Sequence, residues 1–249
     1  MKRLVGLIVT GLLAAAPLPA SAQSGVLLES GGKICFSNDQ MSHESPAEYQ
    51  QRIRDQRALP GWIWESINKM QEVPDVMEFT FRQIGNDRVL IANGGVDQDA
   101  ATHLDAALKR YGPIHEIWFN SPGGSSYQGV LMGDIIRNHG ASTRVLRGDG
   151  CASACSTAFL GGVMREVEPG AVYGVHIYSR TISGTVVLDS DGLNNQTAED
   201  VRNATERALY IGRMGIGKVW LSIWSDTHPG CMTFMSQDQM RKAFVDNLD

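Results

Sequence analysis

Two kinds of segment alternate in the middle of the chain, distinguished by the spacing of their apolar residues. Short apolar runs at 88–92, 116–119 and 142–146 have the length of buried strands, and glycines or other turn residues lie near their ends. The segments between them, at about 98–110 and 126–139, carry apolar residues at three- and four-residue spacing, which predicts helices. Strands that alternate with helices predict an α/β fold with a mainly parallel sheet and right-handed crossovers.

The parts of the chain on either side show weaker patterns. The elements expected there are a strand at 33–36, helices at 46–57 and 62–70, a hairpin over 79–92, a strand at 183–188, and helices at 197–214, 220–224 and 236–245. Ser45 followed by Pro46 marks the start of the first helix, because a serine N-cap and a proline at the first helical position are both favoured. The hairpin is indicated by the Gly-Asn-Asp turn at 85–87.

The first 22 residues have the composition of a secretory signal. Lys2 and Arg3 precede an apolar run at 4–16, and Ala-Ser-Ala at 20–22 is a cleavage pattern of small residues. The apolar run is shorter than the ~20 residues that a membrane-spanning helix needs. We therefore predict a signal peptide at 1–22 and an exported protein that is located in the periplasm.

The remaining chain divides into an N-terminal appendage at 23–81 and one α/β domain at 82–249. The hydrophobic fraction of 43% is ample for a core. The net charge is −5 and no basic stripe occurs, which argues against a nucleic-acid partner. No stretch after the signal is apolar enough to span a bilayer.

Four cysteines follow the signal: Cys35, Cys151, Cys155 and Cys231. An even number in an oxidising compartment favours disulfides, and four cysteines allow three pairings, among which the sequence does not choose. The pairing that we favour joins Cys151 to Cys155 around a turn and Cys35 to Cys231 between the appendage and the domain. No Cys-x-x-Cys pair and no histidine at ligand spacing accompany them, so no metal site is expected.

Two turns in the α/β region carry the residue types of an acyl-transfer site. Asn-Ser-Pro-Gly-Gly at 120–124 ends one predicted strand, and its glycines let the backbone approach a ligand closely. Gly-Cys-Ala-Ser-Ala-Cys at 150–155 follows the next strand and places Ser153 where a turn leads into a helix. The free N–H groups at a helix start are suited to hold an oxyanion. His176 ends the next strand-like run, 23 residues after Ser153.

This order of motifs resembles the proteolytic subunit of the Clp protease, within the Clp/crotonase superfamily. The resemblance covers roughly residue 88 to the C-terminus and includes a late Phe-Met-Ser at 234–236 followed by a polar helix. It implies a Clp/crotonase-like fold of repeated β-α-β units and a peptide or protein substrate. It also implies a homo-oligomer, since the Clp subunit forms rings, although the unmatched appendage could block that assembly.

The resemblance implies a role for each residue of the two turns. Ser153 would attack a carbonyl, and His176 would take its proton and return it to the leaving group. The N–H groups of Gly123 and Ala154 would hold the oxyanion, with Gly124 shaping the turn. Alone, such a serine is more often a small residue needed for helix–strand packing, and such a histidine a hydrogen-bonded core residue. Their order after the double glycine favours the catalytic interpretation.

The resemblance does not supply the third member of a triad. In the Clp subunit an aspartate stands four residues before the serine of the Phe-Met-Ser motif, and here that position is Met232. The nearest acidic candidate is Asp226, which a loop would have to bring to His176. Alternatively, Ser153 and His176 work as a dyad. Disabling the acid lowers kcat by up to ~10⁴ in a triad enzyme. The sequence is therefore compatible with a slow hydrolase and with one that has lost its activity.

Three functions therefore compete. The first, which we favour, is a periplasmic serine peptidase or related acyl hydrolase. The second is a binding or assembly module that keeps the fold without catalysis. The third is a crotonase-type acyl-thioester enzyme, which fits poorly because coenzyme A is not expected in the periplasm and that group does not use this Ser-His pair. No nucleotide motif occurs, so neither a cofactor nor an ATP-driven unfoldase partner is expected.

Overall fold

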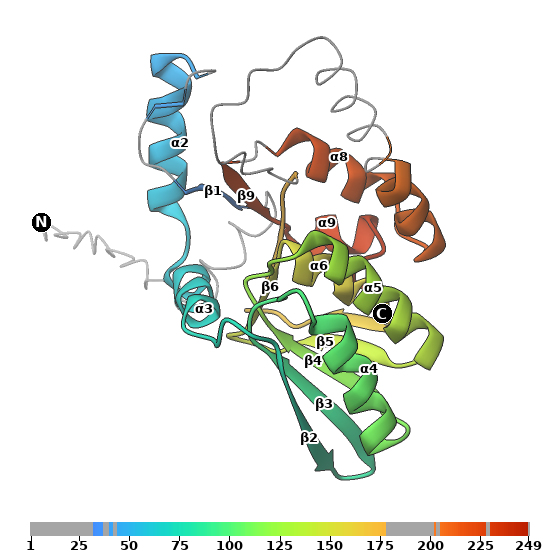
Figure 1. The fold of residues 1–249 in the computed structure, drawn as a ribbon. Helices are drawn as coiled ribbons and strands as arrows, with labels where there is room; N and C mark the ends of the chain where they lie inside the picture. Colours follow the sequence, from blue (N-terminus) through green and yellow to red (C-terminus); the bar gives the residue numbers. More distant parts are fainter. Residues whose placement is uncertain are drawn as a thin grey trace, which may run out of the picture.

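The computed structural model describes residues 32–36, 40–41, 44–177, 202, 205–227 and 230–248. The signal peptide expected at 1–22, the strand expected at 183–188 and the start of the helix expected at 197–214 lie outside the described residues. The described residues form two sheets with helices packed against them (Figure 1). The mixed α/β class predicted from the sequence is therefore confirmed.

The larger sheet has five strands in the order β2-β3-β4-β5-β7. They are β2 (Glu78–Ile84), β3 (Asp87–Asn93), β4 (Glu116–Asn120), β5 (Ser142–Val145) and β7 (Arg165–Val167). The first two form the predicted antiparallel hairpin, and the other three pairs are parallel. The mainly parallel character of this sheet agrees with the prediction. β7 was not predicted, because its three residues, Arg-Glu-Val, contain no apolar run.

The crossovers of this sheet include α4 (Ala100–Tyr111) and α5 (Ser126–His139), which lie side by side over one face (Figure 1). α5 begins and ends at the residues that its apolar spacing predicts. A serine caps its start, and Gly140, with a φ of 77°, ends it in the left-handed conformation. Met132 and Ile136 are fully buried and pack with apolar strand residues in the main core.

The smaller sheet has four strands in the order β1-β9-β8-β6. They are β1 (Gly32–Cys35), β6 (Gly150–Ala152), β8 (Val172–Val175) and β9 (Cys231–Phe234). β6 and β8 are parallel, whereas β9 runs antiparallel to both of its neighbours. β6 was predicted as part of a turn, and β9 was not predicted. All three residues of β6 are small and buried, so neither alternation nor a bulky apolar run marks it as a strand.

Residues 32–81 contribute to both sheets, because β1 pairs with β9 and β2 pairs with β3. Between these strands lie α2 (Pro46–Ala58), which starts with a capping box, and α3 (Gly61–Gln71). Ile63 and Met70 of α3 pack in a second apolar cluster with residues of the smaller sheet. The segment expected as an appendage therefore covers this sheet and supplies one of its strands.

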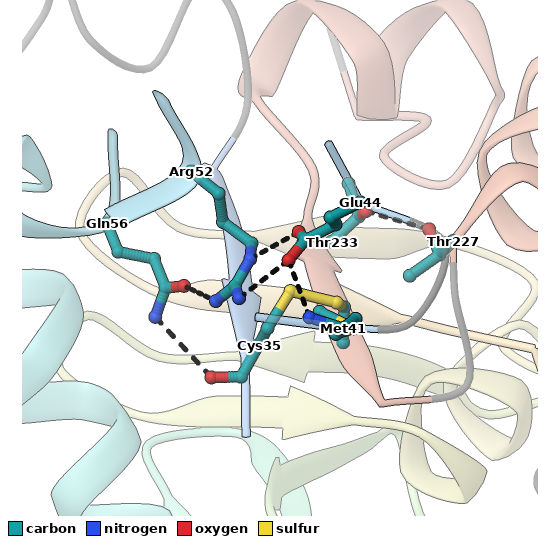
Figure 2. The surroundings of a disulfide bond; sticks show 8 residues. Cys35, Met41, Glu44, Arg52, Gln56, Thr227 and Thr233 are labelled. Carbon is teal, nitrogen blue, oxygen red and sulfur yellow. Dashed lines mark hydrogen bonds and ion pairs between the residues drawn. A yellow bond between two sulfur atoms is a disulfide. The ribbon is translucent and has the colours of Figure 1, made fainter. Parts of the chain in front are cut away.

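A disulfide joins Cys35 of β1 to Cys231 of β9, directly across the strand pair. Figure 2 shows its surroundings, where Arg52 of α2 donates to both carboxylate oxygens of Glu44, at 2.6 and 3.0 Å. Arg52 also donates to the side chain of Gln56, which in turn donates to the Cys35 carbonyl at 3.4 Å. The bond from Gln56 to the Cys35 carbonyl therefore connects α2 to the edge strand of the smaller sheet, and the ion pair connects α2 to the segment that precedes it.

The C-terminal part supplies the last helices of the described chain. Helical residues 205–213 lead to α8 (Lys218–Asp226) and then, after β9, to α9 (Gln237–Lys242). Tyr210 and Trp220 of these segments are buried in the main core. None of the helices that the structure describes is both long and apolar enough to cross a membrane.

Candidate active site

Ser153 lies at the turn between β6 and the short helix α6 (Ala154–Phe159). Its φ of 57° and ψ of −121° are sparsely populated by residues other than glycine. Two hydrogen bonds hold this conformation: its N–H donates to the Gly174 carbonyl at 3.0 Å, and its carbonyl accepts from the Ser156 hydroxyl at 2.6 Å. A strained serine between a strand and a helix has the geometry of a nucleophile elbow, which exposes the hydroxyl to a substrate.

Strand pairing brings His176 to this serine. β6 and β8 are parallel, with Ala152 opposite Gly174, so the residues that follow the two strands meet at one edge of the sheet. His176 Nε2 lies 2.8 Å from Ser153 Oγ, which is within the reach needed for proton transfer. The ring of Phe36, next to β1, meets the imidazole edge to face, with ring centroids 6.3 Å apart. The serine and the histidine expected from the sequence are therefore in contact.

The Asn-Ser-Pro-Gly-Gly loop packs against the turn of Ser153. A Cβ atom on Gly123 would lie 2.6 Å from the Ser153 Cβ and 2.8 Å from the Ala154 nitrogen, so only glycine fits there. The Gly123 N–H donates to the Ser121 hydroxyl at 3.1 Å. This amide, expected at the oxyanion, is thus already bonded within its own loop. Gly124 and Ala154 line a cavity beside the serine.

Asn120, the first residue of the loop, connects it to both sheets. Its side-chain nitrogen donates to the side chain of Asn93 at 3.0 Å, and its side-chain oxygen accepts from the Gly150 N–H at 3.2 Å. Ser121 continues the connection through two backbone bonds with β6. These bonds fix the glycine loop relative to the serine turn. Asn120 was noted in the sequence only as the first residue of the glycine motif, and the hydrogen bonds that it and Asn93 make were not predicted; the available signal was a polar residue ending each of two neighbouring predicted strands.

The second disulfide joins Cys151 in β6 to Cys155 in α6, so it spans the turn that carries Ser153. Both cysteines are fully buried. Together with the bond across β1 and β9, it gives the two pairs that the sequence analysis favoured. The backbone of the candidate nucleophile is therefore fixed covalently on both sides.

Asp226 is not brought to His176. It ends α8 in an exposed position, and its carboxylate accepts hydrogen bonds from the hydroxyls of Ser222 and Ser225 at 3.2 and 3.3 Å. Met232 of β9 lines a cavity next to the imidazole, with an apolar side chain where the resemblance would require an acid. Of the three side chains expected in a triad, the structure brings the serine and the histidine together and leaves the aspartate apart.

Two cavities open beside the serine and histidine, and both residues line each of them. The smaller cavity, of about 110 Å³, is lined by small and hydroxyl-bearing residues together with Arg207, Trp220 and Trp224. The larger cavity, of about 580 Å³, extends toward α3 and β9 and is lined mainly by apolar side chains, Trp64 and Phe234 among them. A substrate held across the serine would meet a polar surface on one side and an apolar surface on the other.

The ionisable side chains around the smaller cavity differ in their charge. Burial raises the pKa of the Tyr173 hydroxyl above its ordinary value, and this hydroxyl donates to the Ser156 carbonyl and accepts from Trp220 Nε1. Burial lowers the pKa of Arg207, but a guanidinium stays protonated at neutral pH. The cavity therefore contains a fixed positive charge. Within the described residues, no cluster of His, Cys, Asp and Glu could hold a metal ion.

No protein-family model matches this chain, and no curated protein matches its sequence. Among solved structures, a mutant of ClpP1 from Listeria monocytogenes is similar, with a TM-score of 0.49 and 17% sequence identity. The similarity covers 64% of this chain and 88% of that one. This similarity describes the fold alone, and an activity has to be inferred from the geometry of the site.

Proposed function

We propose that this protein is an exported serine hydrolase, a Clp-like peptidase that works without ATP. The observation that carries the proposal is the 2.8 Å contact between Ser153 Oγ and His176 Nε2, made by a serine with a φ of 57°. A serine that only filled space between a helix and a strand would not need this strained backbone. A histidine that served only the core would not need to bond a hydroxyl bordering a cavity.

In this mechanism Ser153 Oγ attacks the substrate carbonyl while His176 Nε2 takes the hydroxyl proton. The oxyanion is held by the N–H groups of Gly124 and Ala154, two residues that line the same cavity. Gly123 lets the loop approach the serine turn, because its own N–H is bonded to the Ser121 hydroxyl. The leaving amine then receives the proton from the imidazole, and water releases the acyl group through the same two residues.

We assign the proton transfer to Ser153 and His176. Asp226 bonds to serines of its own helix, so the geometry gives it no direct part in proton transfer. Asp226→Asn should therefore leave the rate of labelling by a serine-reactive probe at the wild-type level. A loss of about 100-fold or more would return Asp226 to the triad.

The two disulfides support export, because such bonds persist in oxidising compartments. With the signal expected at 1–22, we place the mature protein in the periplasm. Its substrates would be peptides or unfolded proteins. Assembly with further copies of the chain is part of the proposal, by its resemblance to a subunit that forms rings.

A fluorophosphonate probe tests the proposal, because such a probe reacts covalently with activated serines. The mature, oxidised chain should be labelled, and both Ser153→Ala and His176→Ala should abolish labelling. Ser225→Ala, which removes an exposed serine of α8, should leave labelling unchanged. Circular dichroism verifies that each variant is folded. A folded, oxidised wild-type protein that takes no label would contradict the hydrolase.

A catalytically inactive binding or assembly module with the same fold is the second candidate. It is favoured by Met232 in place of an acid and by the engagement of Asp226 with Ser222 and Ser225. In that case the wild-type protein takes no label. A peptide retained by the wild type would also be retained by Ser153→Ala with the same affinity, and would be recovered uncleaved from both.

A further inference from the structure

Arg207 lines the smaller cavity together with Ser153 and His176. Its Nη1 donates to the Thr157 hydroxyl at 2.7 Å, and its Nη2 donates to the hydroxyl of Ser126 at the start of α5. Thr157 lies four residues after Ser153, which is about 6 Å along the axis of α6. The guanidinium is thus fixed roughly one helical turn from the candidate nucleophile.

Among the described residues, the two hydroxyls do not compensate the positive charge of Arg207, because serine and threonine accept hydrogen bonds without carrying a charge. Within the described part of the chain, no carboxylate forms an ion pair with Arg207. The phenols of Tyr173 and Tyr210 interact with it electrostatically, and because burial raises the pKa of both, they are neutral at pH 7. Arg213 of the same helical segment, by contrast, pairs with Asp134 at 3.1 Å.

The cavity has the size and the lining to receive a small anionic group. Its volume is about 110 Å³, and one wall is formed by Trp220 and Trp224, whose rings stack with centroids 6.2 Å apart. An apolar wall lowers the local dielectric constant and strengthens the attraction between opposite charges. The guanidinium of Arg207 has five N–H donors, and the hydrogen bonds to hydroxyls do not use them all. The remaining donors can donate two hydrogen bonds to a carboxylate.

We propose that Arg207 selects substrates that carry a carboxylate close to the bond that Ser153 attacks. This inference rests on the proposed hydrolase function and adds a substrate class to it. The carboxylate belongs either to an Asp or Glu side chain next to the scissile bond or to a free C-terminus one residue beyond it. The larger, apolar cavity receives an apolar side chain on the opposite side of that bond.

Matched fluorogenic peptides test the substrate class. The first set is N-acetylated, differs only in Glu, Gln or Leu before a C-terminal fluorogenic amide, and contains no free C-terminal carboxylate. The second set has a neutral residue before the scissile bond and ends one residue later in either a free carboxylate or an amide. We expect the carboxylate member of one set to exceed its neutral partner in kcat/KM by about 10- to 100-fold. The set that shows the preference identifies the source of the carboxylate, and equal values in both sets would overturn the inference.

Variants connect the preference to this arginine. Arg207→Gln should bring the ratio of the two kcat/KM values to about one, because it removes the charge. Arg207→Lys should keep part of the preference, since it keeps the charge without the planar pair of donors. Arg213→Gln, which removes an exposed arginine of the same helical segment, should keep the wild-type ratio. The ratio is the readout because the lost bonds to Thr157 and Ser126 lower the rate for every substrate.

A binding measurement separates a failure of this inference from a failure of the hydrolase. In Ser153→Ala, saturation-transfer NMR should detect binding of N-acetylglutamate α-amide and not of N-acetylglutamine amide, and adding Arg207→Gln should abolish the signal. An acidic C-terminus is probed in the same way with N-acetylglycine and its amide. If the protein binds the carboxylate but is not labelled by the fluorophosphonate, the anion site is supported and the hydrolase function is contradicted. A protein labelled at Ser153 that neither prefers nor binds a carboxylate would reject the anion site alone.

Discussion

The two disulfides both border the serine and histidine pair, but they constrain different things. Cys35–Cys231 closes a loop of 196 residues and joins two strands of the smaller sheet. Cys151–Cys155 spans 4 residues and encloses the turn of Ser153. In the chain-entropy account, a disulfide destabilises the unfolded chain more when the loop is longer. The long bond should therefore act mainly on stability, and the short bond mainly on the geometry of the nucleophile.

The two sheets differ in how far apart in the chain their paired strands lie. The larger sheet pairs each strand with the next strand of the same sheet along the chain, over a continuous apolar core. The smaller sheet pairs β1 with β9 from opposite ends of the described chain, with a smaller apolar cluster beneath it. Such distant pairing carries a larger loss of chain entropy. The pairing of β1 with β9 therefore depends on the Cys35–Cys231 disulfide for its stability. If each disulfide has its own role, mutations should change stability and reactivity separately.

The largest effect is expected from removing the long disulfide. Cys35→Ser combined with Cys231→Ser should lower the free energy of unfolding by about 5 kcal/mol, as estimated from the length of the closed loop. Urea unfolding followed by circular dichroism measures this change. The rate of fluorophosphonate labelling per folded molecule should stay near the wild-type rate. If labelling is lost while the protein stays folded, the bond positions the site and the proposed division of roles is wrong.

The difference between local and long-range pairing also explains which elements could be predicted from the sequence. α5 and the hairpin of β2 and β3 depend on local spacing and local turn residues, and both were predicted closely. β9 pairs with β1 from the other end of the described chain, and β6 consists of three small residues, so neither sequence carries a local strand signal. The even number of cysteines was the one local hint of the contact between β1 and β9.

Removing the short disulfide should have a smaller effect on stability and a larger effect on reactivity. Cys151→Ser combined with Cys155→Ser should lower the free energy of unfolding by about 2 kcal/mol, because the closed loop is short. The labelling rate should fall about 100-fold, since a displacement of the nucleophile by about 1 Å has a cost of that size. The variant without the long disulfide is the matched control. Equal labelling rates in the two variants would remove the distinction between the two bonds.

Weakening the ion pair between Glu44 and Arg52, beside the long disulfide, should lower stability by a smaller amount. Glu44→Gln weakens the charge-assisted bonds to Arg52, whose pKa the carboxylate raises, and should lower the free energy of unfolding by about 1.5 kcal/mol. Glu65→Gln on the exposed face of α3 is the control and should have little effect. Because Gln56 links Arg52 to the Cys35 carbonyl, the effects of Glu44→Gln and of removing the disulfide should be non-additive. Additive losses in urea unfolding would show that the two are independent.

The candidate site, like the fold, could be predicted in part from the sequence. Ser153 follows β6 and His176 follows β8, two neighbouring parallel strands that end at one edge of the smaller sheet, so motif order and topology are enough to predict their contact. The bond from the Gly123 N–H to Ser121 depends on the conformation of one side chain, which spacing does not encode. Arg207 could not be distinguished from the other arginines near it, because its position depends on how its helical segment packs against α5 and α6.

The smallest effect compares two substitutions of the nucleophile. Ser153→Gly and Ser153→Ala both remove the hydroxyl and should both abolish labelling. Only glycine adopts a φ of 57° with this ψ at little cost, so Ser153→Gly should be about 1 kcal/mol more stable to urea than Ser153→Ala. The gain from released strain is partly offset by the greater freedom of glycine in the unfolded chain. Equal stability of the two variants would mean that the elbow stores no strain, and the short disulfide would then not be needed to hold it.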